Sequence, residues 1–486
     1  MQELTFHKFC NLLPDMTGDD FAALKDDISQ NGLINPITIF VGQILDGKHR
    51  YIACKELNIE PKFKTFDGDD EQALHYVISQ NISRRHLEKS QRAALAVEAK
   101  QEFTKIAKDK QKEAGGLGGE FGKLGGRGNK KETEQENDKP LVQKVAQGVL
   151  DKSNEKSRDK ASKLFNVNHQ YINDAEKVKN KDATVFEKVR NGKLNITEAK
   201  HLVSLSEPVR AAALEKIETG GVKKVKEAIY QARKEDFNEK ARNAETILNA
   251  SADDKPVNND IKVEAGDIFQ LGEHILVCAD NTKPATIEYL KKYHAAFCFA
   301  DPPYNALDKD YDKGGFVWSQ DYLTEIADIV CITPGTVSIQ EFMKNTNMPY
   351  KWALATVFSN LHAPAAVGYR QWDFTAIFSG LKSIHRNIKD AINLSIPNMP
   401  ESEKEIAKNR QKPAVYLTWL IESFTKENDL ILDPFIGSGN IILVAETLKR
   451  KCVGVEILPD MCSEIIKRFK LKFPNKEVKN IGRLGR

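Results

Sequence analysis

The sequence predicts a multidomain chain, with an α+β segment, then an all-α segment, then a doubly wound α/β segment. Three observations predict this fold class. Short β-like runs mix with helical patterns near the start, apolar residues recur at three- and four-residue spacing in the middle, and apolar strand-like runs alternate with amphipathic helices near the end. The predicted segments are 1–112, a linker at 113–139, 140–250, a linker at 251–260, and 261–486.

The boundaries follow from local composition. The β-like runs of the first segment are 37–41 and 62–66. Residues 113–139 are rich in Gly and charge and poor in large apolar residues, so they cannot pack a core and are expected to be a flexible linker. Residues 251–260 carry the turn residues and the Pro of a domain boundary.

Residues 157–172 have the pattern of a helix, a short turn and a second helix. A small core is expected from Ala161, Leu164, Val167 and Ile172. The spacing predicts a helix-turn-helix module whose second helix meets base edges or phosphates, although plain helical packing also explains it. The polar side chains expected to contact DNA are Asn168, His169, Gln170 and Tyr171.

The composition is that of a folded chain. The 486 residues are 41% hydrophobic and 29% charged, which allows a sizeable core. No apolar run approaches the roughly 20 residues of a membrane helix, and the first residues lack the order of a signal peptide. The seven cysteines are scattered without a Cys-x-x-Cys pair, which argues against disulfides and a zinc site. We therefore expect a cytoplasmic protein with no membrane partner, while a net charge of +3 is too small to identify a nucleic-acid partner.

A catalytic site is predicted where the apolar run 295–300 ends in an acid–proline–proline–tyrosine corner. The prolines hold the chain extended and remove backbone donors, so the Asp301 carboxylate and the Pro302 carbonyl project as acceptors. Two acceptors beside an aromatic ring suit a flat ring that carries an amino group. An ordinary strand-to-loop turn is the alternative for this motif alone. The candidate catalytic residues are Asp301, Pro302, Pro303 and Tyr304.

A second unit of strand, loop and helix lies at 430–450. Gly437 and Gly439 permit a tight turn and a close approach by a ligand, and the helix N-terminus behind them favours negative charge. The next apolar strand ends in Glu456, which lies 19 positions after Gly437 (456 − 437), the usual reach of a carboxylate that binds ribose hydroxyls. This order of elements predicts a nucleoside-type cofactor.

These two motifs together resemble the catalytic and S-adenosylmethionine motifs of amino-group DNA methyltransferases of the DPPY type, which have a Rossmann-like fold. The catalytic motif comes first, which resembles the permuted β-class order. The run 410–413 is similar to the Q-K-P of this class, and 266–274 and 278–280 resemble its entry hairpin and acidic cofactor loop. The resemblance covers about 261–475, with departures at Asn440, where Thr is commoner, and Ala279, where Gly is usual.

The resemblance implies S-adenosyl-L-methionine as the cofactor and no required metal. It implies direct methyl transfer to the exocyclic amino group of adenine in double-stranded DNA, after the base has left the duplex. An Asp at the first motif position is commoner among adenine enzymes, so amino-cytosine stays open, and RNA is a weaker third substrate. The implied cofactor-binding residues are Asp280, Lys412, Pro413, Asp433, Phe435, Gly437, Ser438, Gly439 and Glu456.

Two basic stretches, 44–54 and 80–87, resemble the central boxes of ParB-like N-terminal domains, over about residues 2–110. A turn glycine, backbone donors and cationic side chains at a helix start can hold a phosphate, although a solvated helix start is the plainer alternative. Gln80 stands where that family often has an acid, which puts nucleotide hydrolysis in doubt. The implied phosphate or DNA contacts are Lys48, His49, Arg50, Arg84 and Arg85.

The function predicted from the sequence is therefore site-specific DNA adenine methylation, with a ParB-like domain and a helix-turn-helix module in front. Two alternatives stay open: an amino-cytosine methyltransferase, and a ParB-like DNA-binding or partition regulator whose methyltransferase fold is vestigial. Whether a nucleotide binds the ParB-like domain, and whether the chain forms a homodimer, is left open.

Overall fold

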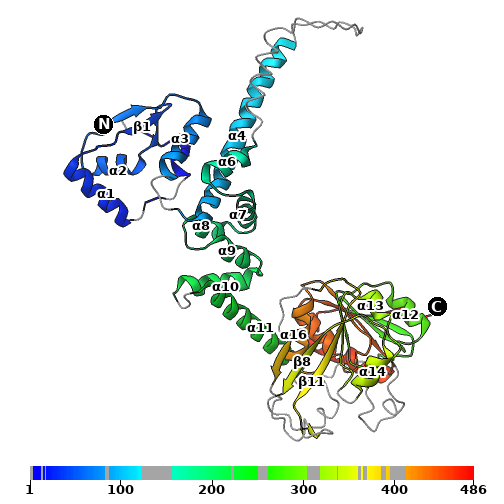
Figure 1. The fold of residues 1–486 in the computed structure, drawn as a ribbon. Helices are drawn as coiled ribbons and strands as arrows, with labels where there is room; N and C mark the ends of the chain where they lie inside the picture. Colours follow the sequence, from blue (N-terminus) through cyan, green and yellow to red (C-terminus); the bar gives the residue numbers. More distant parts are fainter. Residues whose placement is uncertain are drawn as a thin grey trace, which may run out of the picture. The chain divides into compact units, whose positions relative to one another are not determined.

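A computed structural model of the protein describes residues 4–12, 15–16, 18–82, 87–122, 156–220, 224–249, 261–303, 318–335, 338–358, 363–364, 369–384, 390–394 and 412–485 (Figure 1). The chain forms two compact units, Met1–Ala232 and Arg233–Arg486. Among the described helices, none combines the length and the apolar character that crossing a membrane requires.

The first unit begins with the predicted α+β fold. A three-stranded sheet has the order β2-β1-β3, with β1 antiparallel to β2 and parallel to β3. The predicted β-like runs become β1 and β3, which confirms them. The elements are η1 (Lys8–Asn11), α1 (Gly18–Asn31), β1 (Ile37–Phe40), β2 (Gln43–Asp46), α2 (Lys48–Glu56), β3 (Phe63–Thr65), α3 (Asp70–Ile82) and α4 (Lys89–Gly122).

The described part of the middle segment is helical, as predicted. Polar caps start its helices: the Asn168 side chain accepts from the Tyr171 backbone N–H, and Asn195 forms a capping box with Glu198. The elements are α6 (Ser157–Phe165), α7 (His169–Lys181), α8 (Ala183–Arg190), α9 (Ile196–Val203), α10 (Glu207–Glu218) and α11 (Val225–Asn249).

The compact units differ from the predicted segments. Helices α6, α7 and α8 pack on α4, and buried side chains such as Phe103 and Phe165 share one hydrophobic core that joins the first and middle segments. The apolar face of α4 has to be covered, and the middle helices cover it. The predicted linker at 113–139 begins inside α4, which ends at Gly122, while 123–139 and the second linker at 251–260 lie outside the described residues.

The second unit is built on a ten-stranded sheet, as its alternating pattern predicts. The strand order is β12-β8-β11-β7-β6-β13-β14-β5-β4-β15, and β7, β6, β13, β14 and β5 run parallel. These strands are β4 (Asp267–Leu271), β5 (His274–Cys278), β6 (Phe297–Ala300), β7 (Val330–Ile332), β8 (Tyr350–Phe358), β11 (Trp372–Phe378), β12 (Ala391–Leu394), β13 (Leu430–Asp433), β14 (Lys451–Glu456) and β15 (Val478–Arg483). A separate pair is β9 (Ala363–Pro364) and β10 (Tyr369–Arg370).

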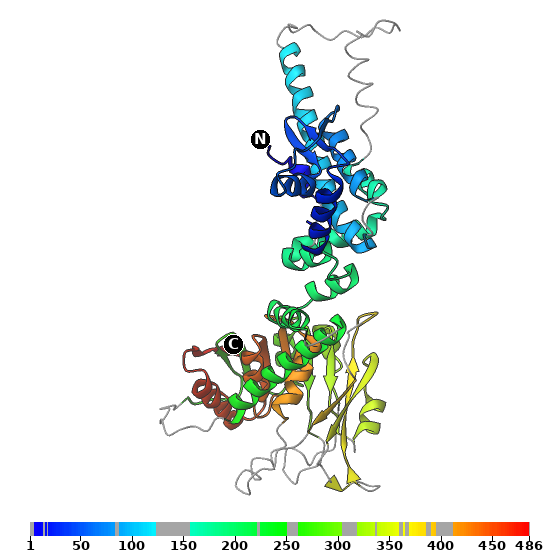
Figure 2. The ribbon, with the colours of Figure 1, turned by 90° about the vertical axis from the view of Figure 1, so that its left-hand side faces the viewer.

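Helices cover both faces of this sheet, which makes the doubly wound arrangement (Figure 2). Buried side chains of α12, α13 and α14 pack on one face, and those of α11, α16, α17 and α18 pack on the other. The bounds are α12 (Pro284–Leu290), α13 (Leu323–Ile326), α14 (Ile339–Asn345), α16 (Ala414–Phe424), α17 (Asn440–Thr447) and α18 (Pro459–Lys472). The seven cysteines are all free.

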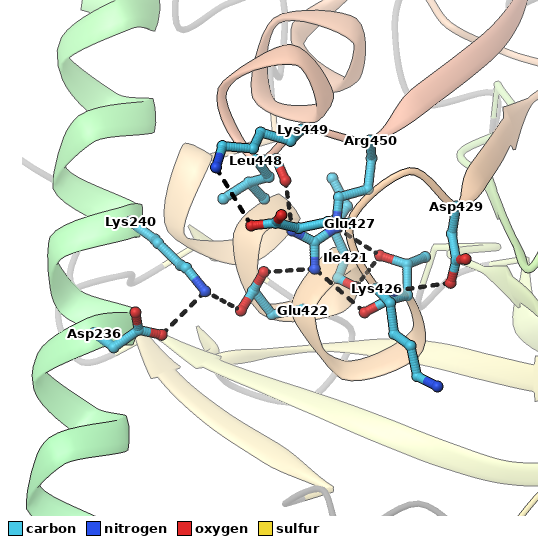
Figure 3. A network of polar contacts seen from close by, with 11 residues as sticks. Asp236, Lys240, Ile421, Glu422, Lys426, Glu427, Asp429, Leu448, Lys449 and Arg450 are labelled. Atoms are coloured by element: carbon cyan, nitrogen blue, oxygen red, sulfur yellow. Dashed lines mark hydrogen bonds and ion pairs between the residues drawn. The ribbon is translucent and has the colours of Figure 1, made fainter. Parts of the chain in front are cut away.

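A chain of charges fixes the C-terminal part of α11 within the second unit (Figure 3). Lys240 pairs with Glu422 of α16 at 2.8 Å, and Glu422 pairs with the buried Arg450 at 2.7 Å. The Arg450 guanidinium also donates to the Thr425 hydroxyl at 3.1 Å and to the Leu448 carbonyl at 2.5 Å. A guanidinium surrounded by acceptors in this way tolerates burial.

Candidate functional site

The two predicted motifs lie at the same edge of the sheet. Strands β6 and β13 are parallel neighbours, and Asp301 follows the first while the loop 433–439 follows the second. From β6 the chain proceeds to β7 on one side, and from β13 it proceeds to β14 on the other. The carboxyl ends of β6 and β13 therefore form a topological switch point, where open α/β sheets bind their ligands.

The Asp301 carboxylate is held by two side chains. The Thr333 hydroxyl donates to Oδ1 at 2.5 Å, and the Lys412 ammonium contacts Oδ2 at 2.6 Å. Both partners enclose the site, so that the Asp301 side chain is 22% exposed and that of Lys412 is 21% exposed. Pro302 is buried and Pro303 is exposed, while Tyr304 lies outside the described residues.

Lys412 therefore lies between the two motifs. Its ammonium contacts Asp301, and its backbone carbonyl accepts from the Asn440 side chain at 3.4 Å. Pro413 follows as the N-cap residue of α16. The sequence associated Lys412 with a cofactor, and the structure adds an ion pair with the predicted catalytic acid.

Glycine is required in the loop after β13. Gly437 and Gly439 have φ of 52° and 77°, the left-handed region that side chains disfavour, and a Cβ on Gly439 would lie 2.8 Å from Ile465. The Ser438 carbonyl accepts from the Arg468 guanidinium. This loop ends at the start of α17, and no described side chain caps the N-terminus of that helix.

The acid at the start of this loop is buried. Asp433 is 3% exposed, and its carboxylate accepts from the Phe435 backbone N–H at 2.9 Å. Burial raises the pKa of Asp433 well above its usual range, and the nearby charges of Asp301 and Glu456 act in the same direction. The buried Asp433 side chain therefore stabilises the turn by accepting from the backbone two residues further on.

Two further predicted acids end neighbouring strands. Glu456 ends β14, is paired in register with Cys278 of β5, and accepts from the Leu458 backbone N–H at 2.9 Å. Burial raises the pKa of Glu456, against backbone hydrogen bonds that lower it. Asp280, just after β5, accepts from the backbone N–H and the hydroxyl of Thr282 at 2.8 and 2.7 Å. Carboxylates thus lie at or just after the ends of β13, β14 and β5.

Sequence reasoning missed Thr333, which follows β7 and lies 32 positions after Asp301. The available signal is local: a hydroxyl directly after the apolar run 329–332 resembles the strand-end position of the predicted acids. Within the described residues, no group of three or more His, Cys, Asp or Glu side chains is placed to hold a metal ion.

The predicted phosphate contacts of the first unit have protein partners. Gly47, with φ of 99°, precedes α2. Lys48 pairs with Asp15 at 2.8 Å, His49 contacts the same carboxylate at 3.4 Å, and Arg50 pairs with Asp46 at 2.8 Å. Arg84 and Arg85 lie outside the described residues. A phosphate at this helix start would compete with these ion pairs.

The predicted helix-turn-helix residues lie at the start of α7. Asn166, with φ of 49°, ends α6, and Asn168 is the N-cap of α7. His169 contacts Asp159 at 3.2 Å, and the exposed Gln170 donates to Asp174 at 2.9 Å. Tyr171 is half-buried beneath the Lys89 ammonium. The exposed His169 and Gln170 side chains can therefore reach a binding partner only by giving up their contacts with Asp159 and Asp174.

The second unit is thus a doubly wound α/β unit with a glycine turn and acidic strand ends at its switch point, the position at which open α/β sheets bind ligands. Residues 106–468 match the model of the N6/N4 methyltransferase family, whose description is DNA methylase. The match covers most of the sequence, and the chain belongs to this DNA methylase family.

Curated relatives match over short stretches. The type II methyltransferase M2.LlaDCHI of Lactococcus lactis subsp. cremoris is 49% identical over 57 residues, 12% of this chain and 21% of that protein. The type II methyltransferase M2.DpnII of Streptococcus pneumoniae is 48% identical over 46 residues, 10% of this chain and 17% of that protein. The matches thus span about a fifth of these relatives' length.

Solved structures resemble parts of the chain. The crystal structure of M1.HpyAVI is 20% identical with a TM-score of 0.30, covering 40% of this chain and 96% of that one. The cytosine-N4-specific PvuII DNA methyltransferase is 15% identical with a TM-score of 0.30, covering 44% and 90%. A Pnob8-like ParB-N domain is 14% identical with a TM-score of 0.29, covering 47% and 94%.

Proposed function

We propose that the chain is an S-adenosylmethionine-dependent DNA methyltransferase that modifies the exocyclic amino group of adenine. The observation that carries this proposal is the position of Asp301 and the loop 433–439 at the ends of two neighbouring parallel strands. Direct methyl transfer requires the group that binds the target amine to lie next to the turn that binds the cofactor. Membership of the DNA methylase family supports this reaction class.

The residues at the switch point fit the cofactor. The left-handed glycines and the α17 N-terminus suit its carboxylate, because they expose backbone N–H groups without side chains in the way. Glu456 at the end of β14 suits the ribose hydroxyls, and Asp280 lies at the adjacent strand end. When bound, S-adenosylmethionine supplies an electrophilic methyl group on a sulfonium.

Asp301 is the group that orients the target amine. Its carboxylate and the Pro302 carbonyl accept the two N–H bonds, which favours a more tetrahedral nitrogen with its lone pair directed at the methyl group. Thr333 and Lys412 hold the carboxylate in place. A carboxylate has about four lone-pair sites, so these contacts leave room for the amine. Tyr304 is proposed to stack on the flipped base.

Labelled methyl transfer to DNA by the full chain and by Asp301→Asn tests the proposal. The variant keeps the size of the side chain but removes its charge and replaces one acceptor oxygen with an NH2 donor, so we expect a loss of at least about 10²- to 10³-fold in rate with cofactor binding retained. Asp328→Asn is a matched control, because Asp328 is a partly exposed acid that pairs with His294. Nucleoside analysis of the product distinguishes methyladenine from methylcytosine. Absence of label in DNA would instead favour a vestigial methyltransferase fold.

We also propose that the first unit binds DNA through the start of α7. The exposed His169 and Gln170, and the exposed Lys177 further along the helix, support this surface. Lys177→Glu in the full chain should weaken DNA binding and reduce the slope of log affinity against log salt by about 1. Lys426→Glu, an exposed lysine of the second unit, is the control. Equal effects of the two variants would contradict a specific role for α7.

A further inference from the structure

A buried side chain that no motif includes joins three loops at the switch-point edge. Asn281 is 8% exposed. Its Nδ2 donates to the Pro434 carbonyl at 2.5 Å, and its Oδ1 accepts from the Gln320 side chain at 2.9 Å. Its backbone carbonyl accepts from the Tyr322 hydroxyl at 3.1 Å. Both ends of the amide are therefore engaged.

The contacts cross the sheet. Asn281 follows β5, whereas Pro434 follows β13, and β14 lies between these strands. Two strand spacings separate β5 from β13 by about 9–10 Å, so the Asn281 amide links their loops past the end of β14. Glu456 ends β14. Two of the predicted cofactor acids, Asp280 and Asp433, thus belong to the loops that this amide ties together, and the third, Glu456, ends the strand between them.

The third loop comes from the catalytic side. Gln320 is 3% exposed and belongs to the segment 318–322, which leads into α13 and then to β7. The end of β7 carries Thr333, which holds Asp301. Asp321 of the same segment accepts from the Trp318 indole at 2.6 Å and from the Asn347 backbone N–H at 2.8 Å. The segment is therefore anchored on its own side of the sheet and is bonded to Asn281.

The junction requires a side chain that can both donate and accept a hydrogen bond, as the Asn281 amide does. Pro434 offers an acceptor and Gln320 offers a donor, so the residue between them has to donate and accept at once within a buried space. A carboxylate at position 281 would place a negative oxygen against the Pro434 carbonyl, and an apolar side chain would leave both partners without a hydrogen bond.

We propose that Asn281 is a positioning residue that holds the Asp280 loop against the glycine loop and, through Gln320, sets both relative to the segment that leads to Thr333 and Asp301. This role rests on the proposed methyltransferase function. Asn281 contacts the loops rather than the ligand, so its removal changes cofactor affinity by letting the loops separate, and it leaves the DNA-binding surface of the first unit unchanged.

The test is cofactor binding and methyl transfer by the full chain carrying Asn281→Ala, Gln320→Ala or both. Loss of one buried hydrogen bond is worth roughly a factor of ten, so Asn281→Ala should raise the Kd for S-adenosylmethionine by about ten- to hundredfold. The double variant should bind S-adenosylmethionine about as tightly as the weaker of the two single variants, because both changes break the same link between the loops. Gln270→Ala is the matched control, since Gln270 donates to the Gly272 carbonyl in the β4–β5 turn at the opposite edge.

Asn281→Asp separates positioning from mere packing. A protonated carboxyl regains a donor for Pro434 and keeps an acceptor for Gln320, and burial raises the pKa of such a carboxyl. Lowering the pH from 8 to 6 should therefore restore cofactor affinity in Asn281→Asp relative to the unaltered chain, whereas Asn281→Ala stays weak. An unchanged Kd in Asn281→Ala, a loss equal to that of Gln270→Ala, or additive single effects would each overturn the role of Asn281. Failure of the unaltered chain to bind the cofactor would overturn the proposed function itself.

Discussion

The ion pair inside the second unit allows a stability prediction to be worked from the structure. The Arg450 side chain is 5% exposed, pairs with Glu422 at 2.7 Å and donates to three further acceptors (Figure 3). Arg450→Met keeps much of the apolar stem but removes the charge and every donor. Breaking a buried pair by removing one partner costs about 3–5 kcal/mol. Glu422 retains Lys240 at 2.8 Å, so we expect the lower end, about 3 kcal/mol.

Tryptophan fluorescence during urea unfolding measures this loss within the second unit. All four tryptophans of the chain, at 318, 352, 372 and 419, belong to that unit. With an m-value of about 3 kcal/mol/M, a loss of about 3 kcal/mol lowers the urea midpoint by about 1 M.

The neighbouring residue supplies the control for Arg450→Met. Lys449 is 74% exposed and contacts Glu427 at 3.6 Å, so Lys449→Met should cost less than about 1 kcal/mol. Equal midpoints for Arg450→Met and Lys449→Met would refute the reasoning.

Two further predictions concern the site and the sheet. Thr333→Val keeps the shape of the side chain but removes a hydrogen bond to the Asp301 carboxylate. We therefore expect a roughly 10- to 100-fold lower kcat for methyl transfer, with little change in the Kd of the cofactor. A larger effect on that Kd than on kcat would contradict the role given to Thr333. Glu446 accepts from the buried His274 and pairs with Lys476, and these contacts lower its pKa to about 2. Because the folded-state pKa lies below the unfolded value of about 4.3, the stabilisation is complete above pH 4.5 and is lost as the pH falls toward 2. The urea midpoint of Glu446→Gln should thus differ most from that of the unaltered chain near pH 6, should keep roughly two fifths of that difference at pH 3, and should converge with it only near pH 2. A constant difference would show that Glu446 acts through packing.

The acidic ends of the strands were predictable because each is a local pattern. An apolar run that stops at an acid marks the end of a buried strand, and Asp301, Asp433 and Glu456 all have this context; a proline follows Asp301 and Asp433 directly. The α/β class of the second unit followed from the same patterns. The start of α7 was predictable as well, because the Asn168 cap is a contact within one turn of helix.

The extent of the first unit was not predictable to the same degree. The composition of 113–139 indicates a linker, yet α4 extends into that stretch, and the middle helices join the N-terminal residues in one core. A linker is predicted from local composition, because a stretch with few large apolar residues cannot form a core. The size of a compact unit depends instead on which apolar faces pack together, and these faces can be far apart in the chain.

From the sequence alone come the identity of the acids and glycines and the order of their strands along the chain, since these depend on neighbouring residues. Only the tertiary structure decides that Lys412 contacts Asp301 across 111 positions, that Thr333 supports the same carboxylate, and that Asn281 meets Pro434. The reason is that such contacts depend on the order of strands within the sheet. That order is fixed by the packing of whole faces, and no short stretch of sequence encodes it.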